Sequence, residues 1–295
     1  MKLAELLYRA INRLRRALYR FGVLRAKRLP VPVVSIGNRA IGGTGKTPAT
    51  IAIARALQER GLHVAVLTRG YGRNSKEQGP VTSLDTERFG DEPVLIKSKN
   101  IDVIVGRNRY ENGLHYSMTE VRGHEGTKER GPSNPRTLVP SYPDVFLLDD
   151  GFQHLQLHRD CDIVIEAPAR FYREGPSSLR DADIVLQRKI RAVNAGAVAG
   201  KRVFAFSGLA NNAQFFDTLR TLGADVIGTH EFPDHHRYTL ADLRGVRNAA
   251  RGADVIVTTE KDAVKIGPAD DIMALRIEME IGDDVIAGIL RRIGK

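Results

Sequence analysis

One glycine-rich segment constrains the fold of this chain more than any other feature. Residues 42–48 read Gly-Gly-Thr-Gly-Lys-Thr-Pro and come shortly after an apolar run at residues 31–37. A turn of this kind, between a buried strand and a helix that we predict over residues 46–60, points backbone N–H groups at a phosphate, and the helix N-terminus adds its positive dipole end. The sequence therefore predicts an α/β fold that binds ATP or GTP.

The same segment supplies side chains for the phosphates. Lys46 can reach the β- and γ-phosphates, and the Thr47 hydroxyl can hold Mg²⁺. The usual pattern has glycine where Ala40 stands, and Gly42 and Gly43 can supply the missing backbone freedom. A turn that only joins strand to helix is the alternative, and Gly-Lys-Thr after an apolar strand disfavours it. The predicted nucleotide-binding residues are Ala40, Ile41, Gly42, Gly43, Thr44, Gly45, Lys46 and Thr47.

Short apolar runs alternate with helical stretches along the rest of the chain. Most of the runs are continuous rather than alternating in hydrophobicity, which is typical of strands buried on both faces, so we predict a mostly parallel sheet with helices on each side. The predicted strands are residues 31–37, 63–68, 101–105, 144–149, 162–166, 183–186, 202–207, 225–228 and 254–258. The predicted helices include residues 48–60, 212–222, 240–250 and 283–292.

Breaks in this pattern suggest a domain organisation. A basic stretch leads into Ala-Gly repeats between residues 188 and 200. We predict a basic helix in residues 1–30, a P-loop domain in residues 31–192 and a smaller domain in residues 193–295. The polar stretch 108–143, with glycine and proline near its end, is predicted to be a surface insertion or a mobile loop.

Composition restricts the cellular compartments in which the protein is expected. Of the 295 residues, 42% are hydrophobic, which supports a real core, and the single Cys161 excludes a disulfide within the chain and fits a reducing compartment. Cys161 begins an apolar run, so we expect a packed thiol. No run of eighteen apolar residues could span a bilayer, and no signal peptide is evident, so we expect the protein in the cytoplasm.

The net charge of +10 is concentrated near the N-terminus, where residues 1–30 hold nine Lys or Arg and one acidic residue. Apolar residues recur there at helical spacing: Leu3, Leu6, Leu7, Ala10, Ile11, Leu14, Leu18 and Phe21. Arg9, Arg13, Arg16 and Arg20 fall on another face. Such a helix suits the surface of an anionic membrane, or it packs on its own domain with a solvated basic face. No stacking platform or base-reading motif points to nucleic acid.

A second chemical signal follows the apolar run at residues 144–148, which ends in Asp149 and Asp150. In P-loop enzymes a strand near the nucleotide ends in an acid that holds Mg²⁺. A helix N-cap is the alternative for one aspartate, whereas two beside a P-loop favour metal. Gln153 and His154 follow closely and could position a phosphate, a water or a neighbouring loop.

Two loops carry a candidate acid–base pair. Gly90-Asp-Glu-Pro93 is a short acidic turn, and residues 232–238 hold two histidines and an acid. A carboxylate and a histidine brought together make a tunable general base, although spacing does not show that Asp91 meets His235. A zinc site is disfavoured because His235 and His236 point apart if extended. Residues 258–265 are interpreted as mainly structural, with Thr259 as an N-cap, and contact with substrate or nucleotide is the alternative.

These segments, in this order, resemble the tetraacyldisaccharide 4'-kinase family, the lipid A 4'-kinases. The resemblance covers most of the chain, from the basic helix to about Lys265. The matching segments are Pro32-Val-Val-Ser-Ile-Gly-Asn38, Gly42-Gly-Thr-Gly-Lys-Thr-Pro48, Thr68-Arg-Gly-Tyr-Gly72, Gly90-Asp-Glu-Pro93, Val105-Gly-Arg107, Asp149-Asp-Gly-Phe-Gln-His154, Phe232-Pro-Asp-His235 and Thr259-Glu-Lys-Asp-Ala-Val-Lys265.

The resemblance implies a kinase that moves the γ-phosphoryl of ATP to the 4'-hydroxyl of a tetraacyl glucosamine disaccharide 1-phosphate, in lipid A biosynthesis. Its setting would be the cytoplasmic face of the bacterial inner membrane, with no obligate protein partner evident. The family pattern also implies a P-loop domain joined to a smaller α/β domain, with the active site between them. Asp91 would be the catalytic base and His235 its partner. Thr47, Asp149 and Asp150 would serve Mg²⁺.

One family element is only partly present. Arg173-Glu-Gly-Pro matches the family's Arg-Glu-Pro-Leu, whereas the segment usually ahead of it is replaced by Ala169-Arg-Phe-Tyr172. The resemblance implies that Glu174 is a magnesium or active-site carboxylate. Arg69, Arg73 and Arg107 are candidates for contacting substrate phosphate, with solvated surface charge as the alternative.

A membrane-associated P-loop ATPase switch is the main rival function. Many such proteins carry an additional lysine just before the paired glycines, where this chain has Ile41. A ligase or synthetase of the dethiobiotin type, with a soluble substrate, is a weaker rival.

Overall fold

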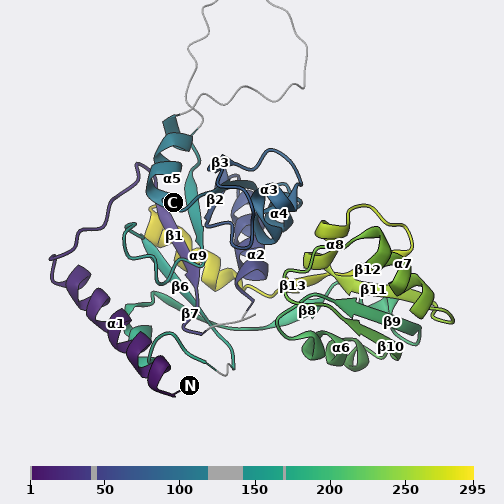
Figure 1. Ribbon diagram of the computed structural model, residues 1–295. Helices are drawn as coiled ribbons and strands as arrows, with labels where there is room; N and C mark the ends of the chain where they lie inside the picture. Colours follow the sequence, from purple (N-terminus) through teal and green to yellow (C-terminus); the bar gives the residue numbers. More distant parts are fainter. Residues whose placement is uncertain (1, 41–44, 119–141, 169–170) are drawn as a thin grey trace, which may run out of the picture.

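Parallel strands buried on both faces form the larger of two sheets. The computed structural model describes residues 2–40, 45–118, 142–168 and 171–295, with side chains from residue 6 onward. In this part of the chain a seven-stranded sheet has the order β3-β4-β2-β5-β1-β6-β7, and every neighbouring pair is parallel except β3 and β4 (Figure 1). Its strands are β1 (Val33–Gly37), β2 (Val64–Thr68), β3 (Gly79–Pro80), β4 (Asp102–Val105), β5 (Val145–Asp149), β6 (Cys161–Glu166) and β7 (Ile184–Gln187).

Alternate residues of these strands feed two cores, one on each face of the sheet. Helices α2 (Lys46–Gln58), α4 (Asp91–Lys97) and α9 (Asp283–Ile293) contribute Ile53, Val94 and Ile289 to the core that contains Val34. Helix α5 (Arg109–Met118) packs on the other core, which contains Phe146. Coverage of both faces explains why the strands read as continuous apolar runs.

A second sheet stands beside the first. It has the order β10-β9-β11-β12 and is parallel throughout the described residues. Its elements are β9 (Arg202–Ser207), α6 (Asn212–Thr221), β10 (Asp225–Glu231), α7 (Leu240–Ala249), β11 (Val255–Thr259), α8 (Glu260–Ile266) and β12 (Ile272–Leu275). The antiparallel pair β8 (Ile190–Ala192) and β13 (Ile277–Met279) joins the two bodies (Figure 1). Short helices α3 (Thr86–Phe89), η1 (Pro176–Asp181) and η2 (Ala195–Ala197) complete the described elements.

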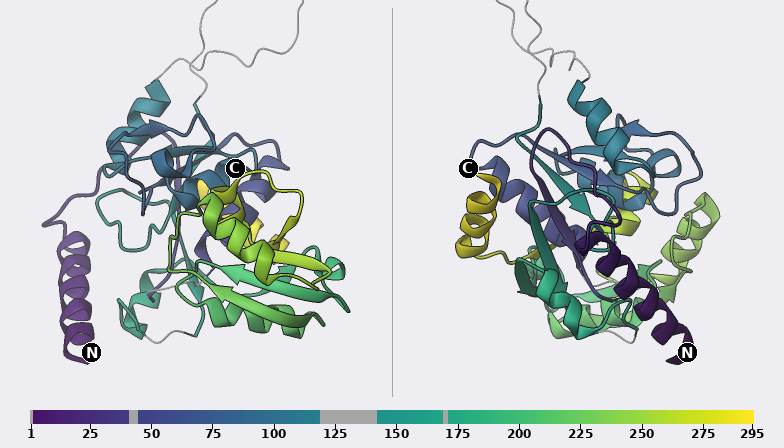
Figure 2. Two further views of the ribbon diagram at one scale, coloured as in Figure 1. Left: turned by 45° about the vertical axis from the view of Figure 1, so that its right-hand side comes forward. Right: turned by 90° about the vertical axis from the view of Figure 1, so that its left-hand side faces the viewer.

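The last helix returns to the first sheet. Helix α9 buries Ile286, Ile289 and Ile293 in the large core, although the predicted division assigned its residues to the smaller domain. Figures 1 and 2 agree that the N- and C-terminal helices both lie on the larger body. The smaller body is therefore an excursion of the chain between β8 and β13.

Sequence and structure differ in the polar stretch 108–143. Residues 109–118 form helix α5 rather than a loop, and residues 119–141 lie outside the described residues. Gly113 inside the helix lowers its propensity, and the few apolar side chains that pack on the core, such as Leu114, give a weak pattern. Strands β8, β12 and β13 were also not predicted. The predicted N-cap is confirmed, since the Asp262 N–H donates to Thr259 Oγ1 at 3.1 Å.

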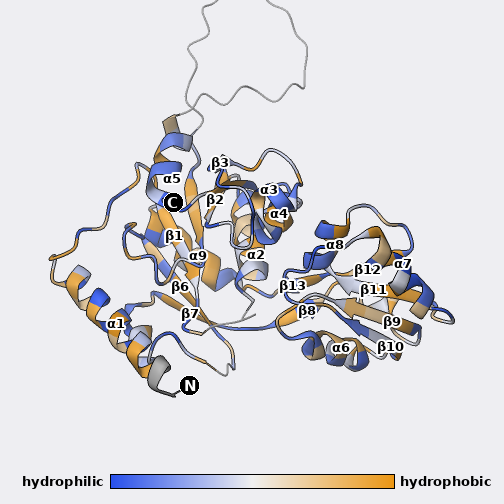
Figure 3. Cartoon of the chain, in the orientation of Figure 1, coloured by the Kyte–Doolittle hydropathy of each residue, from blue (hydrophilic) through white to orange (hydrophobic). Residues whose placement is uncertain are grey.

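The N-terminal helix α1 (Lys2–Arg20) contacts the body through its polar side. The guanidinium of Arg16 binds Glu174, Arg20 pairs with Asp181, and Arg9 donates to the Tyr172 carbonyl at 3.3 Å. Apolar side chains of α1 are left exposed, and Figure 3 shows the orange, hydrophobic residues along this helix at the margin of the body. The exposed residues are Leu6, Leu7, Ile11 and Leu14, each 50–62% accessible. The helix thus packs on its own domain, as the alternative predicted, but through Arg9, Arg16 and Arg20 rather than with its basic face in solvent.

Candidate active site

The carboxyl ends of β1, β2 and β5 meet at one edge of the large sheet, because these strands are parallel neighbours. Gly45, in the left-handed conformation at φ 88°, immediately precedes α2. Lys46 starts that helix, and its Nζ lies 3.6 Å from Asp150 Oδ1. The predicted phosphate cradle at Ile41, Gly42, Gly43 and Thr44 lies outside the described residues, so its contacts stay a prediction.

Asp149 is a buried carboxylate with an unusual charge balance. It ends β5 with only 2% exposure, and the hydroxyls of Thr50 and Thr68 donate to it at 3.1 and 3.4 Å. Burial, together with the negative charges of Glu92 and Asp150, raises the pKa of Asp149 to about 7, against the opposing effect of Lys46. Burial at this edge therefore disfavours the charged form of Asp149.

Asp150 adopts the left-handed backbone conformation at φ 49°. Its carboxylate forms ion pairs with Lys46 and Arg173. Burial alone would raise its pKa, but Lys46, Arg173 and Arg109 outweigh burial and hold the pKa of Asp150 below its usual value. Its Oδ2 accepts from Arg173 at 3.4 Å, and its Oδ1 has no hydrogen-bond partner within the described residues.

These oxygens fit a hard divalent cation. Mg²⁺ prefers oxygen ligands and usually keeps water and substrate phosphates besides one or two carboxylates. The Thr47 hydroxyl, Asp149 and Oδ1 of Asp150 supply such a set, although that Oδ1, which accepts no hydrogen bond within the described residues, faces Lys46 at 3.6 Å. No group of three or more His, Cys, Asp or Glu side chains suited to a metal occurs in residues that the structure describes, so phosphate and water would have to complete the shell.

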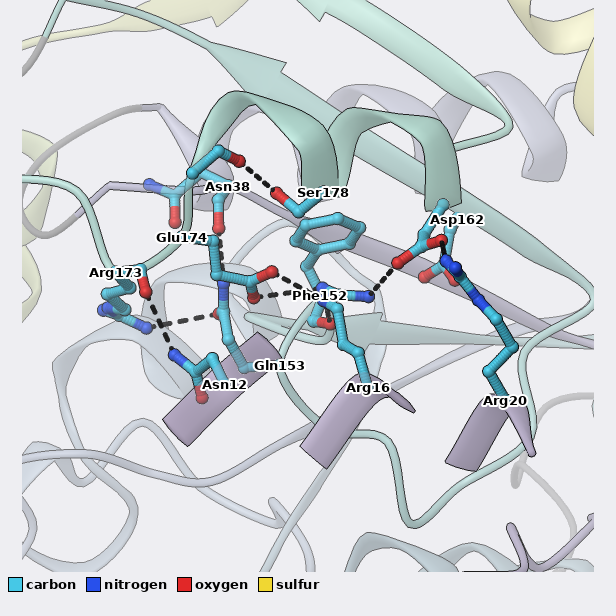
Figure 4. A network of polar contacts seen from close by, with 12 residues as sticks. Asn12, Arg16, Arg20, Asn38, Phe152, Gln153, Asp162, Arg173, Glu174 and Ser178 are labelled. Carbon is cyan, nitrogen blue, oxygen red and sulfur yellow. Dashed lines mark hydrogen bonds and ion pairs between the residues drawn. The ribbon is translucent and has the colours of Figure 1, made fainter. Parts of the chain in front are cut away.

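Glu174 is held elsewhere. Both of its oxygens accept from Arg16, at 2.6 and 3.0 Å, and its side chain is 3% exposed (Figure 4). Arg16 also donates to the Phe152 carbonyl, and Asn12 donates to the Arg173 carbonyl. Helix α1 thus fixes the segment whose Arg173 contacts Asp150. The magnesium role of Glu174 stays a prediction, and its carboxylate already has a cationic partner.

Gln153 and His154 position neighbouring segments, which was one of their predicted roles. The Gln153 side-chain amide donates to the Asn38 carbonyl at 2.7 Å. Burial, followed by the charge of Arg109, lowers the pKa of His154 to about 3. The neutral ring accepts from Arg109 at its Nδ1, at 3.0 Å. Arg109 was not singled out from the sequence.

The structure brings Asp91 and His235 together from the two bodies. Asp91 is the first residue of α4, and His235 lies in the loop between β10 and α7. His235 Nδ1 and Asp91 Oδ2 are 2.9 Å apart. A Cβ built on Gly72 would lie 3.1 Å from His235 Nδ1, so the glycine leaves room for this contact. His236 pairs instead with Asp242, which separates the two histidines chemically.

Lysines from α8 control the charge of Asp91. Burial by itself raises its pKa, but the hydrogen bond from His235 and the charges of Lys265 and Lys261 outweigh burial and lower it. Lys265 is 3% exposed, with its Nζ 3.9 Å from Asp91 Oδ2 and 2.7 Å from Asp262 Oδ1. The sequence analysis interpreted residues 258–265 as mainly structural and did not identify Lys265 as a neighbour of Asp91. Asp91 is therefore held as a carboxylate.

A model of the tetraacyldisaccharide-1-P 4'-kinase family matches residues 1–294. The chain belongs to this family. Kinases named tetraacyldisaccharide 4'-kinase are similar over most of its length. The one from Pelobacter propionicus is 34% identical over 95% of this chain and 87% of its own, and the one from Anaeromyxobacter dehalogenans is 35% identical over 98% and 88%.

A solved structure supports both the fold and the family membership of this chain. The "apo" form of LpxK from Aquifex aeolicus in complex with ATP matches with a TM-score of 0.74 and 29% identity, over 98% of this chain and 97% of that one. The predicted membership of the tetraacyldisaccharide 4'-kinases, the mixed α/β fold with a mostly parallel sheet, and the lipid A 4'-kinase function are confirmed.

Proposed function

We propose that this kinase activates the 4'-hydroxyl of a tetraacyl disaccharide 1-phosphate with Asp91, across the gap between its two bodies. The observation that carries the assignment is the 2.9 Å contact between Asp91 and His235. The charge of Glu92, next to Asp91, acts on Asp149, so the pair stands near the carboxylates beside the P-loop.

Phosphoryl transfer then needs few chemical groups. Asp91 accepts the hydroxyl proton as the oxygen attacks the γ-phosphorus, and the bond from that phosphorus to the bridging oxygen breaks to release ADP. His235 orients the carboxylate, and Lys46 balances charge on the transferred group. An ATPase switch would need no such base directed at an acceptor.

Magnesium would be held by Thr47, Asp149 and Asp150. When bound, it supplies positive charge to the phosphates. The support is that burial disfavours the charge of Asp149, and that Oδ1 of Asp150 accepts no hydrogen bond within the described residues and has Lys46 Nζ at 3.6 Å.

We further propose that α1 rests on the cytoplasmic face of the bacterial inner membrane, where a lipid acceptor resides. Its support is the outward apolar face, which includes Leu7 and Leu14, on a basic segment. In the part of the chain that the structure describes, no helix is long and apolar enough to cross a bilayer.

Label transfer tests the proposed reaction. ATP labelled at the γ-phosphate is incubated with a tetraacyl disaccharide 1-phosphate in detergent micelles, and label is sought on the lipid at the 4'-position. Labelled lipid is expected. Labelled inorganic phosphate with no labelled lipid would contradict the proposal and favour the ATPase switch.

A further inference from the structure

Arg188 lies against the P-loop although its sequence context gives no hint of it. It follows β7, and its backbone N–H donates to the Glu166 carbonyl at 3.0 Å, which fixes the chain at the end of the strand. A Cβ built on Gly45 would lie 3.4 Å from Nε, 3.5 Å from Cδ and 3.6 Å from Cγ of Arg188. The arginine side chain therefore lies in van der Waals reach of the last glycine of the nucleotide-binding turn.

Among the residues that the structure describes, the guanidinium of Arg188 has no counter-charge. Its Nε is covered from solvent yet has no hydrogen-bond partner, and no described carboxylate forms an ion pair with it. Burial alone lowers the pKa of Arg188, with no neighbouring charge opposing it. Nearby arginines differ, because Arg39 pairs with Glu166 and Arg191 with Glu278. A partly desolvated cation without an anion is unfavourable unless a ligand provides one.

The turn next to Arg188 is where an anion is expected. Gly45 precedes the N-terminus of α2, and the family relative with the same fold holds ATP. Lys46, the other cation at this turn, already faces Asp150. A guanidinium offers a planar fork that matches phosphate oxygens in pairs.

We propose that Arg188 binds the phosphate chain of ATP at the P-loop, as a nucleotide contact additional to Lys46. The inference rests on the proposed kinase reaction only in requiring ATP at this turn. It predicts an asymmetry: Arg188 contributes to stability when phosphates are present and contributes nothing favourable when they are absent.

Binding and unfolding of Arg188→Gln test this asymmetry. Calorimetric titration should show a Kd for ATP and for tripolyphosphate that is raised about tenfold or more, because a charge-assisted hydrogen bond is lost. The affinity for adenosine should not change. The Tm of the nucleotide-free protein should stay at or above that of the wild type, while its rise on adding ATP shrinks. Arg188→Lys should retain part of the affinity.

Arg191→Gln provides the matched control, since Arg191 is 64% exposed, three residues away and paired with Glu278. It should bind ATP like the wild type. The proposal is overturned if Arg188→Gln binds ATP within about twofold of the wild type, if both variants lose affinity equally, or if the loss accompanies a lower Tm without nucleotide. If the wild-type protein binds no ATP, the proposed function is contradicted as well. If label is transferred to the lipid but Arg188→Gln binds ATP like the wild type, only this inference is contradicted.

Discussion

At the scale of single residues, the proposed chemistry depends on Asp91, whose charge is set by groups from the other body. Sequence could predict its role, because Gly90-Asp-Glu-Pro93 matches a family pattern. Residue spacing could not predict the contact with His235, because the two residues are 144 positions apart and lie in different bodies, and only the family resemblance implied the pairing. It also missed Lys265, whose i, i+3 spacing from Asp262 is common to many helices.

Removing the positive charge of Lys265 tests this control. Lys265 lowers the pKa of Asp91, so Lys265→Met should raise that pKa. Because the base must be ionised, the acidic limb of the profile of kcat/KM against pH should move to higher pH. Exposed Lys201→Met is the control and should leave the limb in place. An unmoved limb in Lys265→Met would show that this lysine does not act on Asp91.

Asp149 should destabilise the nucleotide-free enzyme at neutral pH. Its folded pKa of about 7 lies above the ordinary value, so the stability it gives when protonated is present at low pH and is lost as the pH rises toward 7 and beyond. In the presence of EDTA, Asp149→Asn should therefore melt several degrees above the wild type at pH 8 and close to it at pH 4. An equal or lower Tm for the variant at pH 8 would contradict this charge balance.

At the scale of elements, the sequence predicted most strands because parallel strands read as continuous apolar runs. It failed for α5, where Gly113 and few packed side chains weaken the helical pattern. For α1, spacing predicted two faces but not which of them meets the protein. Carboxylates distant in sequence decide this: Glu174 and Asp181 bind its arginines and leave the leucines outside.

The exposed face of α1 should bind lipid. Replacing Leu7 and Leu14 with Glu removes apolar area and adds negative charge, so co-sedimentation with anionic vesicles should fall roughly tenfold or more. Leu240→Glu is the control, because Leu240 is 76% exposed on α7 of the other body. If the double variant sediments with vesicles like the control, α1 is not the membrane contact.

An ion pair between Arg16 and Glu174 holds α1, and the two side chains are only 10% and 3% exposed. Substitutions of these two residues should therefore have strongly coupled effects on the free energy of unfolding. Arg16→Gln leaves Glu174 buried without its partner, so urea unfolding should show a loss of about 3–5 kcal/mol. Adding Glu174→Gln should restore much of that loss, because the unpaired charge is then gone. Independent, additive effects of the two changes would refute this coupling.

At the scale of the whole molecule, each body holds half of the acid–base pair. Asp91 belongs to the body with the P-loop, while His235 and Lys265 belong to the other. A break in composition suggested two domains near residue 192, but composition does not reveal that β13 and α9 return to the first. Helix α9 packs on the first sheet because this contact buries its apolar side, and such a tertiary contact is not visible in composition.

Single-turnover transfer by Asp91→Asn tests the central claim most directly. Enzyme in excess over γ-labelled ATP is mixed with lipid acceptor, and label on the lipid is followed in time, with ATP affinity measured in parallel. The account predicts a rate about 100- to 10,000-fold below that of the wild type, with ATP affinity almost unchanged. Transfer at close to the wild-type rate would mean that another group activates the hydroxyl.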